Sequence, residues 1–186
     1  MLRLRINDDI ELCLLEERHT EMSFALVDRN RSHLRTWMPW VKPGYSLEDS
    51  RSYIKDNLKR LADNAGFDLS IFYREQMAGQ IGYNRLDWDN RTTELGYWLG
   101  ESFQGRGLVT AACRKLIDYA FDELKMNRVE IRCAAANTRS RAVPERLGFQ
   151  QDGILRQAEW LHDAFVDLVV YSTLAGEWQR NSALQK

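Results

Sequence analysis

Residues 94–107 read Glu94-Leu95-Gly96-Tyr97-Trp98-Leu99-Gly100-Glu101-Ser102-Phe103-Gln104-Gly105-Arg106-Gly107. The first six residues predict a strand, and the glycines after it predict a tight turn that exposes consecutive N–H groups. A helix is expected next, because apolar residues recur at helical spacing at Leu108, Ala112, Leu116, Ala120 and Leu124. Since a helix N-terminus carries a positive partial charge, the turn from Gln104 to Gly107 suits a phosphate anion.

Two well-known phosphate motifs do not fit this turn. A Walker loop needs a following Gly-Lys-Ser/Thr, and the dinucleotide fingerprint needs a third glycine that is missing here. Two glycines by themselves also fit a loop that merely starts a helix, because such short motifs often arise by chance. The surrounding chain has to decide between these interpretations.

The remaining elements follow one another without a linker, low-complexity tract or repeat. We expect strands near residues 10–14, 67–73, 77–86, 94–99, 129–133, 149–161 and 165–174. Helices are expected near residues 20–30, 46–66, 108–124 and 141–147. This order predicts an α/β fold, a mixed central β-sheet flanked by helices, in a single domain that covers residues 1–186.

Particular residues predict two of the helix boundaries. Ser46 and Asp49 resemble a capping box at the start of one helix, and Gly66 is expected to stop that helix. Proline is tolerated in the first turn of a helix but breaks its interior. The helix that contains Pro144 is therefore expected to begin close to Ser140.

Composition narrows the class of protein. With 26 Lys and Arg against 27 Asp and Glu, the net charge of −1 argues against a general polyanion binder and against direct nucleic-acid contact. The apolar runs are too short to cross a bilayer, and the chain starts without a signal-peptide pattern, so we expect a cytoplasmic protein with no membrane contact. Neither a disulfide framework nor a metal site is predicted, because the candidate ligands are scattered: Cys13, Cys113, Cys133, His19, His33 and His162.

Gln104, Gly107 and Val109 match the frame Gln-x-x-Gly-x-Gly/Ala, with valine standing where glycine or alanine is usual. In this the chain resembles the GNAT superfamily of acetyltransferases, whose acetyl-CoA motif has this frame after a strand. It is most similar to the RimJ/RimL branch, and within it to the RimL type, whose members acetylate the N-terminal amine of ribosomal proteins. The resemblance covers nearly the whole chain and includes residues 31–40, 137–140, 147–149 and 156–161.

The resemblance implies a GNAT fold with acetyl-CoA as cosubstrate and no metal. The implied cofactor-binding residues are Trp98, Leu99, Gln104, Gly105, Arg106, Gly107, Leu108, Val109, Thr110, Asn137 and Ser140. Main-chain groups of Trp98 and Leu99 are expected to pair with the pantetheine, and those near Leu99 to polarise the thioester carbonyl. Asn137 is expected to bond the pantetheine or adjacent backbone, with a plain turn residue as the alternative. The implied partners are an acceptor protein N-terminus, such as that of a ribosomal protein, and a second copy in a homodimer.

Two residues are implied in catalysis. Glu159 matches the RimL-type position of a general base, and its apolar neighbours Ala158 and Trp160 are expected to desolvate it and raise its pKa. Ser140 is the candidate to protonate or hydrogen-bond the departing thiolate. The alternatives are an outward-facing strand glutamate and a serine that only caps a helix. One carboxylate acting through a water is adequate for a protein α-amine, whose pKa is roughly 7.7–8.0.

Several other residues have two interpretations. Cys133 has no adjacent histidine, so a buried, inert thiol is preferred to a covalent acetyl-cysteine. The segment Trp37–Trp40 fits either a lid over the acceptor or ordinary core packing. Three basic residues have three interpretations: they bind the 3′-phosphate of coenzyme A, they bind an acidic acceptor protein, or they lie on a solvated helix face. These residues are Arg139, Arg141 and Arg146.

Three functions remain open from the sequence. The leading hypothesis is acetyl transfer from acetyl-CoA to the N-terminal α-amine of a protein, with Glu159 as the base. The second is acetylation of a small amine such as a polyamine or an antibiotic, and a polyamine site is expected to carry a denser acidic lining. The third is a non-catalytic acyl-CoA-binding module, in which Glu159 and Ser140 are dispensable.

Overall fold

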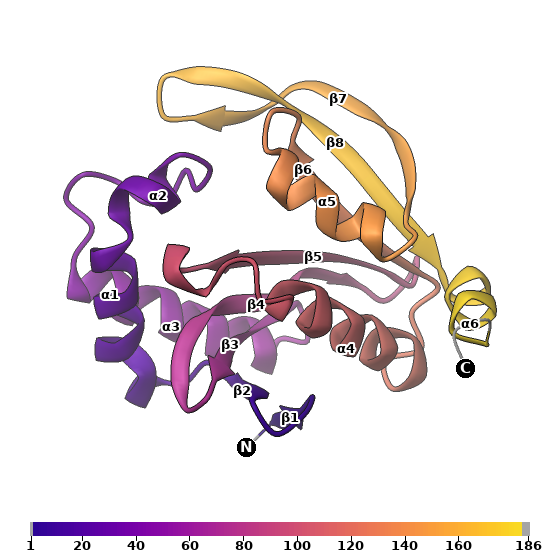
Figure 1. Ribbon diagram of the computed structural model, residues 1–186, viewed down its shortest axis with the longest axis horizontal. Helices are drawn as coiled ribbons and strands as arrows, with labels where there is room; N and C mark the ends of the chain where they lie inside the picture. Colours follow the sequence, from indigo (N-terminus) through magenta and orange to yellow (C-terminus); the bar gives the residue numbers. More distant parts are fainter. Residues whose placement is uncertain (1, 184–186) are drawn as a thin grey trace.

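The computed structural model describes residues 2–183 and places their eight strands in one sheet (Figure 1). The strands are β1 (Arg3–Arg5), β2 (Ile10–Leu14), β3 (Phe67–Tyr73), β4 (Gln76–Asp87), β5 (Thr92–Leu99), β6 (Arg128–Ala134), β7 (Gln150–Leu161) and β8 (Ala164–Leu174). The α-helices are α1 (Thr20–Arg29), α2 (Arg31–Arg35), α3 (Leu47–Ala62), α4 (Leu108–Asp122), α5 (Thr138–Arg146) and α6 (Ala175–Ala183). Two 3₁₀ turns are η1 (Glu17–His19) and η2 (Glu101–Phe103).

The sheet is mixed, as the sequence predicts, and its strand order is β1-β2-β3-β4-β5-β6-β8-β7. Only β5 and β6 run parallel; all the other neighbouring pairs in the described chain are antiparallel. The parallel pairing joins Thr92–Leu95 to Arg128–Ile131, although β5 continues to Leu99 and β6 to Ala134. The two strands therefore part beyond Leu95 and leave a gap between them.

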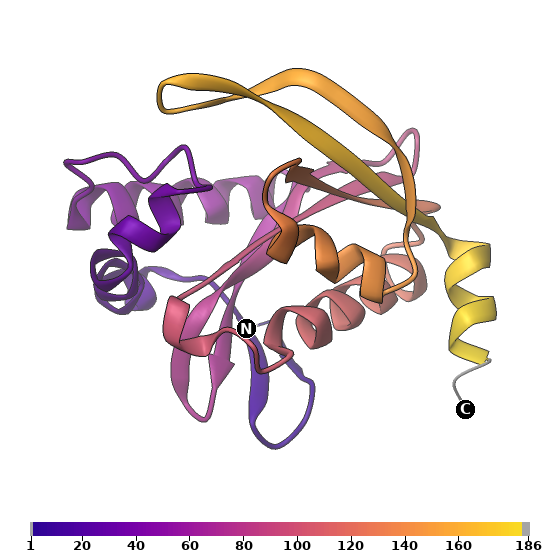
Figure 2. The same cartoon turned by 45° about the horizontal axis from the view of Figure 1, so that its top comes forward.

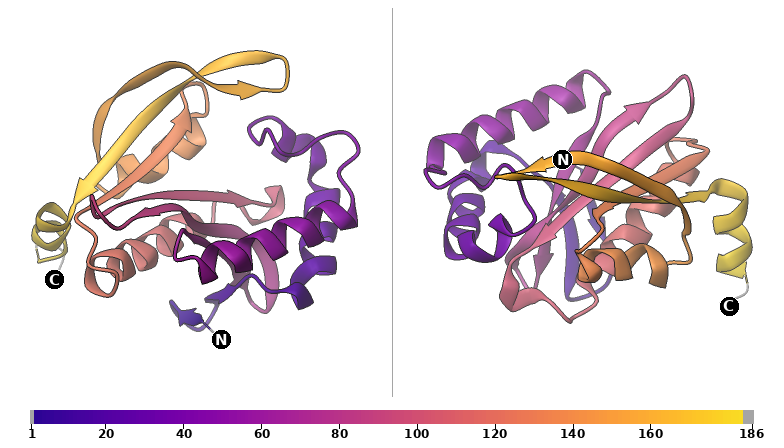
Figure 3. Two further views of the ribbon diagram at one scale, coloured as in Figure 1. Left: turned by 180° about the vertical axis from the view of Figure 1, so that it is seen from behind. Right: turned by 90° about the horizontal axis from the view of Figure 1, so that it is seen from above.

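Helix α4 packs on one face of the sheet, and α1 and α3 cover the other face (Figures 1 and 3). The face under α4 is apolar, and Leu116 and Ile117 are fully buried in one cluster with Leu69 and Ile81. The hydroxyl of Tyr83 donates a hydrogen bond to the Leu116 carbonyl (2.5 Å) and so ties β4 to the helix. Burial of this apolar face supplies most of the driving force that holds α4, and hence its N-terminus, in place.

Hydrogen bonds cross the interface between the sheet and α1 and α3. The Asn57 side chain donates to the Leu15 carbonyl (3.1 Å) and accepts from the Asp68 N–H (2.6 Å). The Gln80 amide donates to the Ser23 hydroxyl (3.0 Å). These buried polar groups are paired, so they fix the helices on the strands at little desolvation cost.

Helix α3 begins where the sequence predicts and ends earlier. The Ser46 hydroxyl accepts from the Asp49 N–H (3.3 Å), and the Asp49 carboxylate accepts from the Ser46 N–H (2.8 Å), which completes the capping box. The helix stops at Ala62, four positions before the expected stop at Gly66. Asn64 is the physical reason, because it adopts the left-handed backbone (φ 53°) that terminates helices and that asparagine tolerates.

Helix α5 begins earlier than the sequence predicts. It begins at Thr138 and not near Ser140, so Pro144 lies in its interior, and that prediction was wrong. Asn137 is the N-cap, because its side-chain oxygen accepts from the Ser140 N–H (3.1 Å). The idea that Ser140 only caps the helix was therefore wrong as well.

The last two strands form a long hairpin that arches away from the body of the sheet (Figures 1 and 2). Its tip, at the predicted His162-Asp163 turn, reaches the end of α2, where the His162 ring nitrogen lies 2.7 Å from the Arg35 carbonyl oxygen. Strand β1 and helices α2 and α6 were not predicted, although Leu2, Leu4 and Ile6 alternate with arginines as in a strand. Among residues 2–183, no helix is long and apolar enough to cross a membrane.

Candidate active site

One cavity of about 1530 Å³ runs from the glycine turn to the parted strands. All the residues expected from the sequence to bind the cofactor line it: Trp98, Leu99, Gln104, Gly105, Arg106, Gly107, Leu108, Val109, Thr110, Asn137 and Ser140. They come from β5, from the loop that follows it, from α4 and from α5. The fold therefore brings together, in one site, residues whose elements lie up to four positions apart in the chain.

The turn exposes amides because its glycines adopt a left-handed backbone. Gly105 and Gly107 both have a φ of +73°, and Gly107 is the N-cap of α4. The first helical bond joins the Ala111 N–H to the Gly107 carbonyl (3.0 Å). The N–H groups of the three residues between them precede this bond, so they have no intrahelical partner and are available to an anion.

Side chains around the turn hold it in place. The Gln104 side chain accepts a hydrogen bond from Arg139 (2.7 Å) and lies 2.9 Å from the His33 ring nitrogen. Arg146 donates to the Thr110 hydroxyl (2.9 Å). Val109, which departs from the usual motif, is half-buried and packs against the main core, so its side chain has a structural role while its N–H belongs to the free first turn.

The gap between β5 and β6 offers a second set of backbone groups. The Gly100 N–H bonds the Ala78 carbonyl of β4 (2.9 Å), so alternation along β5 turns the N–H groups of Trp98 toward β4 and those of Tyr97 and Leu99 toward the gap. Buried backbone groups require partners. The geometry therefore favours Leu99 and Tyr97, and not the main chain of Trp98, as the groups that pair with an extended ligand.

The charge of the cavity suits a phosphorylated ligand. Among the described residues that line it, basic side chains outnumber the carboxylates of Glu101 and Asp118. The basic residues are Arg5, Arg106, Arg114, Lys115, Arg139 and Arg146. With the free amides of α4, these residues fit the phosphates of coenzyme A. Arg141 does not join them, because it donates to the Tyr171 hydroxyl (2.9 Å) and the Ala135 carbonyl (3.0 Å).

Ser140 lies where the cavity meets the parted strands. Its hydroxyl donates to the Tyr97 hydroxyl (3.4 Å), and its Oγ lies 3.2 Å from the Cys133 Sγ. Cys133 is buried, and burial raises the pKa of its thiol, as expected for an unreactive cysteine. Asn137 is occupied as the cap of α5 and fixes the helical turn that carries Ser140.

A bulge in β7 positions Glu159. The register of the hairpin shifts between Leu155 and Glu159, where Gln157 has a φ of +48° and its N–H donates to the Asp167 carboxylate (2.7 Å). Such bulges re-aim the residues that follow them. Glu159 is half-buried, whereas its neighbour Trp160 is 52% exposed, because successive strand residues point to opposite faces.

Burial raises the pKa of Glu159 above its ordinary value, and the negative charge of Glu94 raises it further. The direction and the main cause, desolvation by burial, agree with the sequence-based expectation. The adjacent Ala158 and Trp160 are themselves exposed. The negative charge of Glu94, on another strand, is a further cause that the sequence did not predict.

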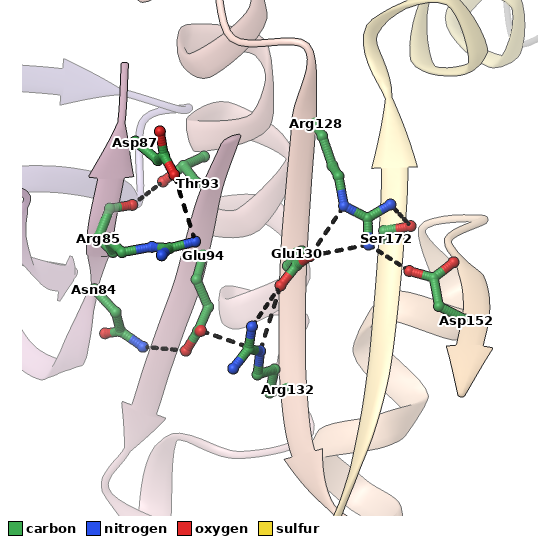
Figure 4. A network of polar contacts seen from close by, with 10 residues as sticks. All are labelled: Asn84, Arg85, Asp87, Thr93, Glu94, Arg128, Glu130, Arg132, Asp152 and Ser172. Carbon is green, nitrogen blue, oxygen red and sulfur yellow. Dashed lines mark hydrogen bonds and ion pairs between the residues drawn. The ribbon is translucent and has the colours of Figure 1, made fainter. Parts of the chain in front are cut away.

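Glu94 belongs to a chain of alternating charges across the sheet (Figure 4). It accepts from the Asn84 amide (2.9 Å) and pairs with Arg132 (3.2 Å), which also pairs with Glu130 (2.9 Å). Glu130 in turn pairs with Arg128 (2.9 Å). Glu94, which interacts with Glu159, is therefore paired with an arginine that it shares with Glu130.

The segment Trp37–Trp40 lies between the core and the cavity, and its role as a lid over the acceptor stays a prediction. Trp37 and Met38 line the cavity. The Trp40 ring is 40% exposed and lies 5.9 Å from the Trp98 ring and 5.7 Å from the Tyr45 ring. The segment thus packs on the core with one side and borders the cavity with the other.

Sequence reasoning missed several residues of the site. Tyr97, His33, Arg114 and Lys115 line the cavity, and Glu94 acts on Glu159 from a distance. The alternation of β5 placed Tyr97 on the same face as Leu95 and Leu99, but nothing in the sequence showed which helix would meet its hydroxyl. Within residues 2–183 no group of three or more His, Cys, Asp or Glu side chains is arranged to hold a metal ion.

Comparisons with known proteins agree with this geometry. The family described as "Acetyltransferase (GNAT) domain" matches residues 10–150. YdaF of Bacillus subtilis (strain 168), a proposed ribosomal N-acetyltransferase, is 39% identical over 180 residues, which are 96% of this chain and 98% of YdaF. The chain therefore belongs to the GNAT acetyltransferase family, and the predicted fold, enzyme class and cosubstrate are confirmed.

Two solved structures are similar over nearly the whole chain. The microcin self-immunity acetyltransferase MccE, in complex with acetyl-CoA and AMP, is 32% identical with a TM-score of 0.89, over 92% of this chain and 95% of that one. RimL, a ribosomal α-N-protein acetyltransferase in complex with coenzyme A, is 27% identical with a TM-score of 0.89, over 93% of this chain and 98% of that one. The resemblance to the RimJ/RimL branch is thereby confirmed.

We predict that Gly107→Ala weakens coenzyme A binding by about 5- to 30-fold, because a left-handed backbone costs a non-glycine residue roughly 1–2 kcal/mol and the turn relaxes to avoid it. Isothermal titration calorimetry with coenzyme A measures the loss. Gly176→Ala is the matched control, since a Cβ at Gly176 has open space and the position lies in α6. Equal affinities of both variants and the parent protein would refute the role of the turn.

We predict that Glu94→Gln lowers the pKa of Glu159. The negative charge of Glu94 raises that pKa, so its removal favours the ionised form of Glu159 at lower pH. Carbon-13 NMR titration of the Glu159 carboxyl measures the shift, with Glu75→Gln in the distant β3–β4 turn as control. An unchanged Glu159 titration in Glu94→Gln would show that the two carboxylates do not interact.

Proposed function

We propose that the chain transfers the acetyl group of acetyl-CoA to the N-terminal α-amine of a protein, with a ribosomal protein as the acceptor. The observation that carries the proposal is the half-buried Glu159, whose pKa is raised and whose charge interacts with Glu94 on the strand that borders the gap. The names of YdaF and RimL support a ribosomal acceptor. A cytoplasmic location is consistent with such an acceptor and stays a prediction.

Acetyl-CoA supplies an activated thioester carbonyl when it is bound. The amides of residues 108–110 and the cationic lining hold its phosphates, and the strand amides that face the gap hold its extended arm. The N–H of Leu99 is the donor available to the thioester carbonyl oxygen. Acetyl-CoA held in this way would bring its thioester to the part of the cavity that Leu99, Tyr97 and Ser140 line.

The reaction requires a neutral amine, so a proton has to leave it. Glu159 accepts this proton through a water, and its raised pKa brings it closer to the roughly 7.7–8.0 of a protein α-amine. The amine nitrogen then bonds the carbonyl carbon, and the carbon–sulfur bond breaks with its electron pair on sulfur. The acylated nitrogen releases its second proton to solvent, which leaves a neutral amide. The Ser140 hydroxyl donates a hydrogen bond to the thiolate, which takes its proton from solvent.

The charge balance near Glu159 favours an α-amine over a polyamine. A polycation needs several uncompensated carboxylates, but Glu94 and Glu130 share Arg132, and Glu130 also pairs with Arg128. A lysine side chain, with a pKa near 10.4, would require a much stronger base than one glutamate. A single α-ammonium therefore fits this surface best.

The likeness to MccE supports a second candidate, acetylation of an antibiotic-like small molecule. A non-catalytic acyl-CoA-binding module is the third. The homodimer also remains a prediction. The apolar surface available for it is on the hairpin, where large side chains are exposed: Ile154, Leu155, Trp160 and Phe165.

Incubation of the purified protein with acetyl-CoA and a panel of acceptors tests the proposal. The panel contains Ser- and Ala-starting peptides, the same peptides with blocked N-termini, polyamines and aminoglycosides, and thiol release is followed. We expect turnover with free N-termini and none with blocked ones. Turnover with small amines alone would establish the second candidate, and cofactor binding without any turnover the third.

We predict that Glu159→Gln lowers kcat/KM for the acceptor peptide by about 10²- to 10⁴-fold below the pKa of the acceptor amine, since only a positioned base captures its proton there. The pH–rate profile from pH 6 to 10 measures the effect, with exposed Glu123→Gln as the matched control. The base assignment is wrong if the Glu159→Gln and parent profiles coincide.

A further inference from the structure

Pro144 leaves a carbonyl without its helical partner in the part of α5 that faces the cavity. In an α-helix the carbonyl of residue 140 bonds the N–H of residue 144, and proline has no N–H. In this structure the Tyr97 hydroxyl donates to the Ser140 carbonyl instead, at 2.9 Å. The interior proline of α5 is thus accommodated by a tyrosine from β5.

Tyr97 also contacts the side chain of the same serine. Its ring packs against the main core, and Ser140 Oγ donates to its hydroxyl oxygen at 3.4 Å. Cys133 Sγ lies on the other side of Ser140 Oγ at 3.2 Å. Tyr97 therefore holds Ser140 at its main chain and contacts its side chain more weakly.

Counting donors defines the direction of these hydrogen bonds. Tyr97 has one hydroxyl hydrogen and uses it on the Ser140 carbonyl, so toward Ser140 Oγ it can only accept. Burial raises the pKa of Tyr97 and that of Cys133, so both keep their protons at neutral pH. Of the hydroxyls of Tyr97 and Ser140, only that of Ser140 then lacks a strong acceptor. Its bond to the Tyr97 hydroxyl is 3.4 Å, which is long for an O–H···O hydrogen bond.

The weak bond leaves the Ser140 hydroxyl free to choose a better acceptor. A thiolate attracts a donor more strongly than a neutral phenol does. Serine is a much weaker acid than a thiol, so Ser140 keeps its proton and acts by hydrogen bonding. Since hydrogen bonds weaken steeply when misaligned, the benefit depends on how firmly Ser140 is oriented.

We propose that Tyr97 and Pro144 are positioning residues for Ser140: the proline vacates the Ser140 carbonyl, and the tyrosine hydroxyl bonds it and so aims the serine hydroxyl at the departing thiolate. This inference rests on the role of Ser140 in the proposed function. The Tyr97 hydroxyl then contributes to kcat only by orienting Ser140. Tyr97 and Ser140 both line the cavity, whereas Pro144 is buried behind them in α5.

A double-mutant cycle tests the inference on kcat and on KM for acetyl-CoA, with Tyr97→Phe, Ser140→Ala and the double variant. Ser140→Ala is expected to lower kcat about 10- to 100-fold, the effect of one hydrogen bond to a charged group. Tyr97→Phe is expected to lower kcat about 5- to 10-fold with little change in KM, and to have no effect in the Ser140→Ala background. Tyr83→Phe is the matched control, because its hydroxyl also donates from the sheet to a helix carbonyl, and its kcat should equal that of the parent.

The outcomes separate this inference from the proposed function. Suppose that Ser140→Ala lowers kcat, but that Tyr97→Phe either has no effect or lowers kcat equally in the parent protein and in the Ser140→Ala variant. Tyr97 then does not act through Ser140, and this inference is wrong while the proposed function stands. If Ser140→Ala leaves kcat unchanged, the role of Ser140 falls, and the inference with it.

Pro144→Ala tests the same arrangement without removing Ser140 or Tyr97. It restores an N–H that competes for the Ser140 carbonyl, so kcat is expected to fall toward that of Tyr97→Phe although the helix gains propensity and thermal stability. A stable Pro144→Ala protein with the kcat of the parent, together with an unaffected Tyr97→Phe, would overturn the proposal.

Discussion

The site depends on the parting of two parallel strands. Parallel pairing of β5 and β6 stops at Leu95, and the remaining residues of β5 keep their bonds to β4 on one edge only. The main-chain groups of Tyr97 and Leu99 on the other edge then lack a strand partner, and a buried backbone group without a partner is costly. A ligand that pairs with them supplies the missing bonds, so the sheet itself provides the binding surface.

The elements around this gap and the hairpin of β7 and β8 carry two kinds of chemical group. On the α4 side, glycines with left-handed backbone and a cationic lining suit phosphates. On the hairpin, a bulge places Glu159 where burial and the charge of Glu94 raise its pKa. Ser140 belongs to α5, which follows β6, so it lines the same cavity as the open edge of β5.

The sequence predicts local features of the fold well and contacts between distant residues poorly. Alternation gave the bounds of β3, β4 and β8 to within two residues, and Ser46 with Asp49 marked the start of α3. Pro144 misled, because its cost in a helix interior is offset by a bond from Tyr97, which lies 43 residues from its Ser140 acceptor. Glu94 escaped notice for the same reason, since its effect on Glu159 arises only when the hairpin folds over the sheet. The cofactor residues were found through their resemblance to a family, and not from two glycines alone.

Amide hydrogen exchange of the parted strand, measured by NMR with and without coenzyme A, tests the central claim most directly. If the cofactor pairs with the open edge of β5, the Tyr97 and Leu99 amides become markedly protected on binding. The Trp98 amide, which faces β4, is already protected and changes little. Saturating coenzyme A that leaves Tyr97 and Leu99 as exchangeable as before would contradict the account.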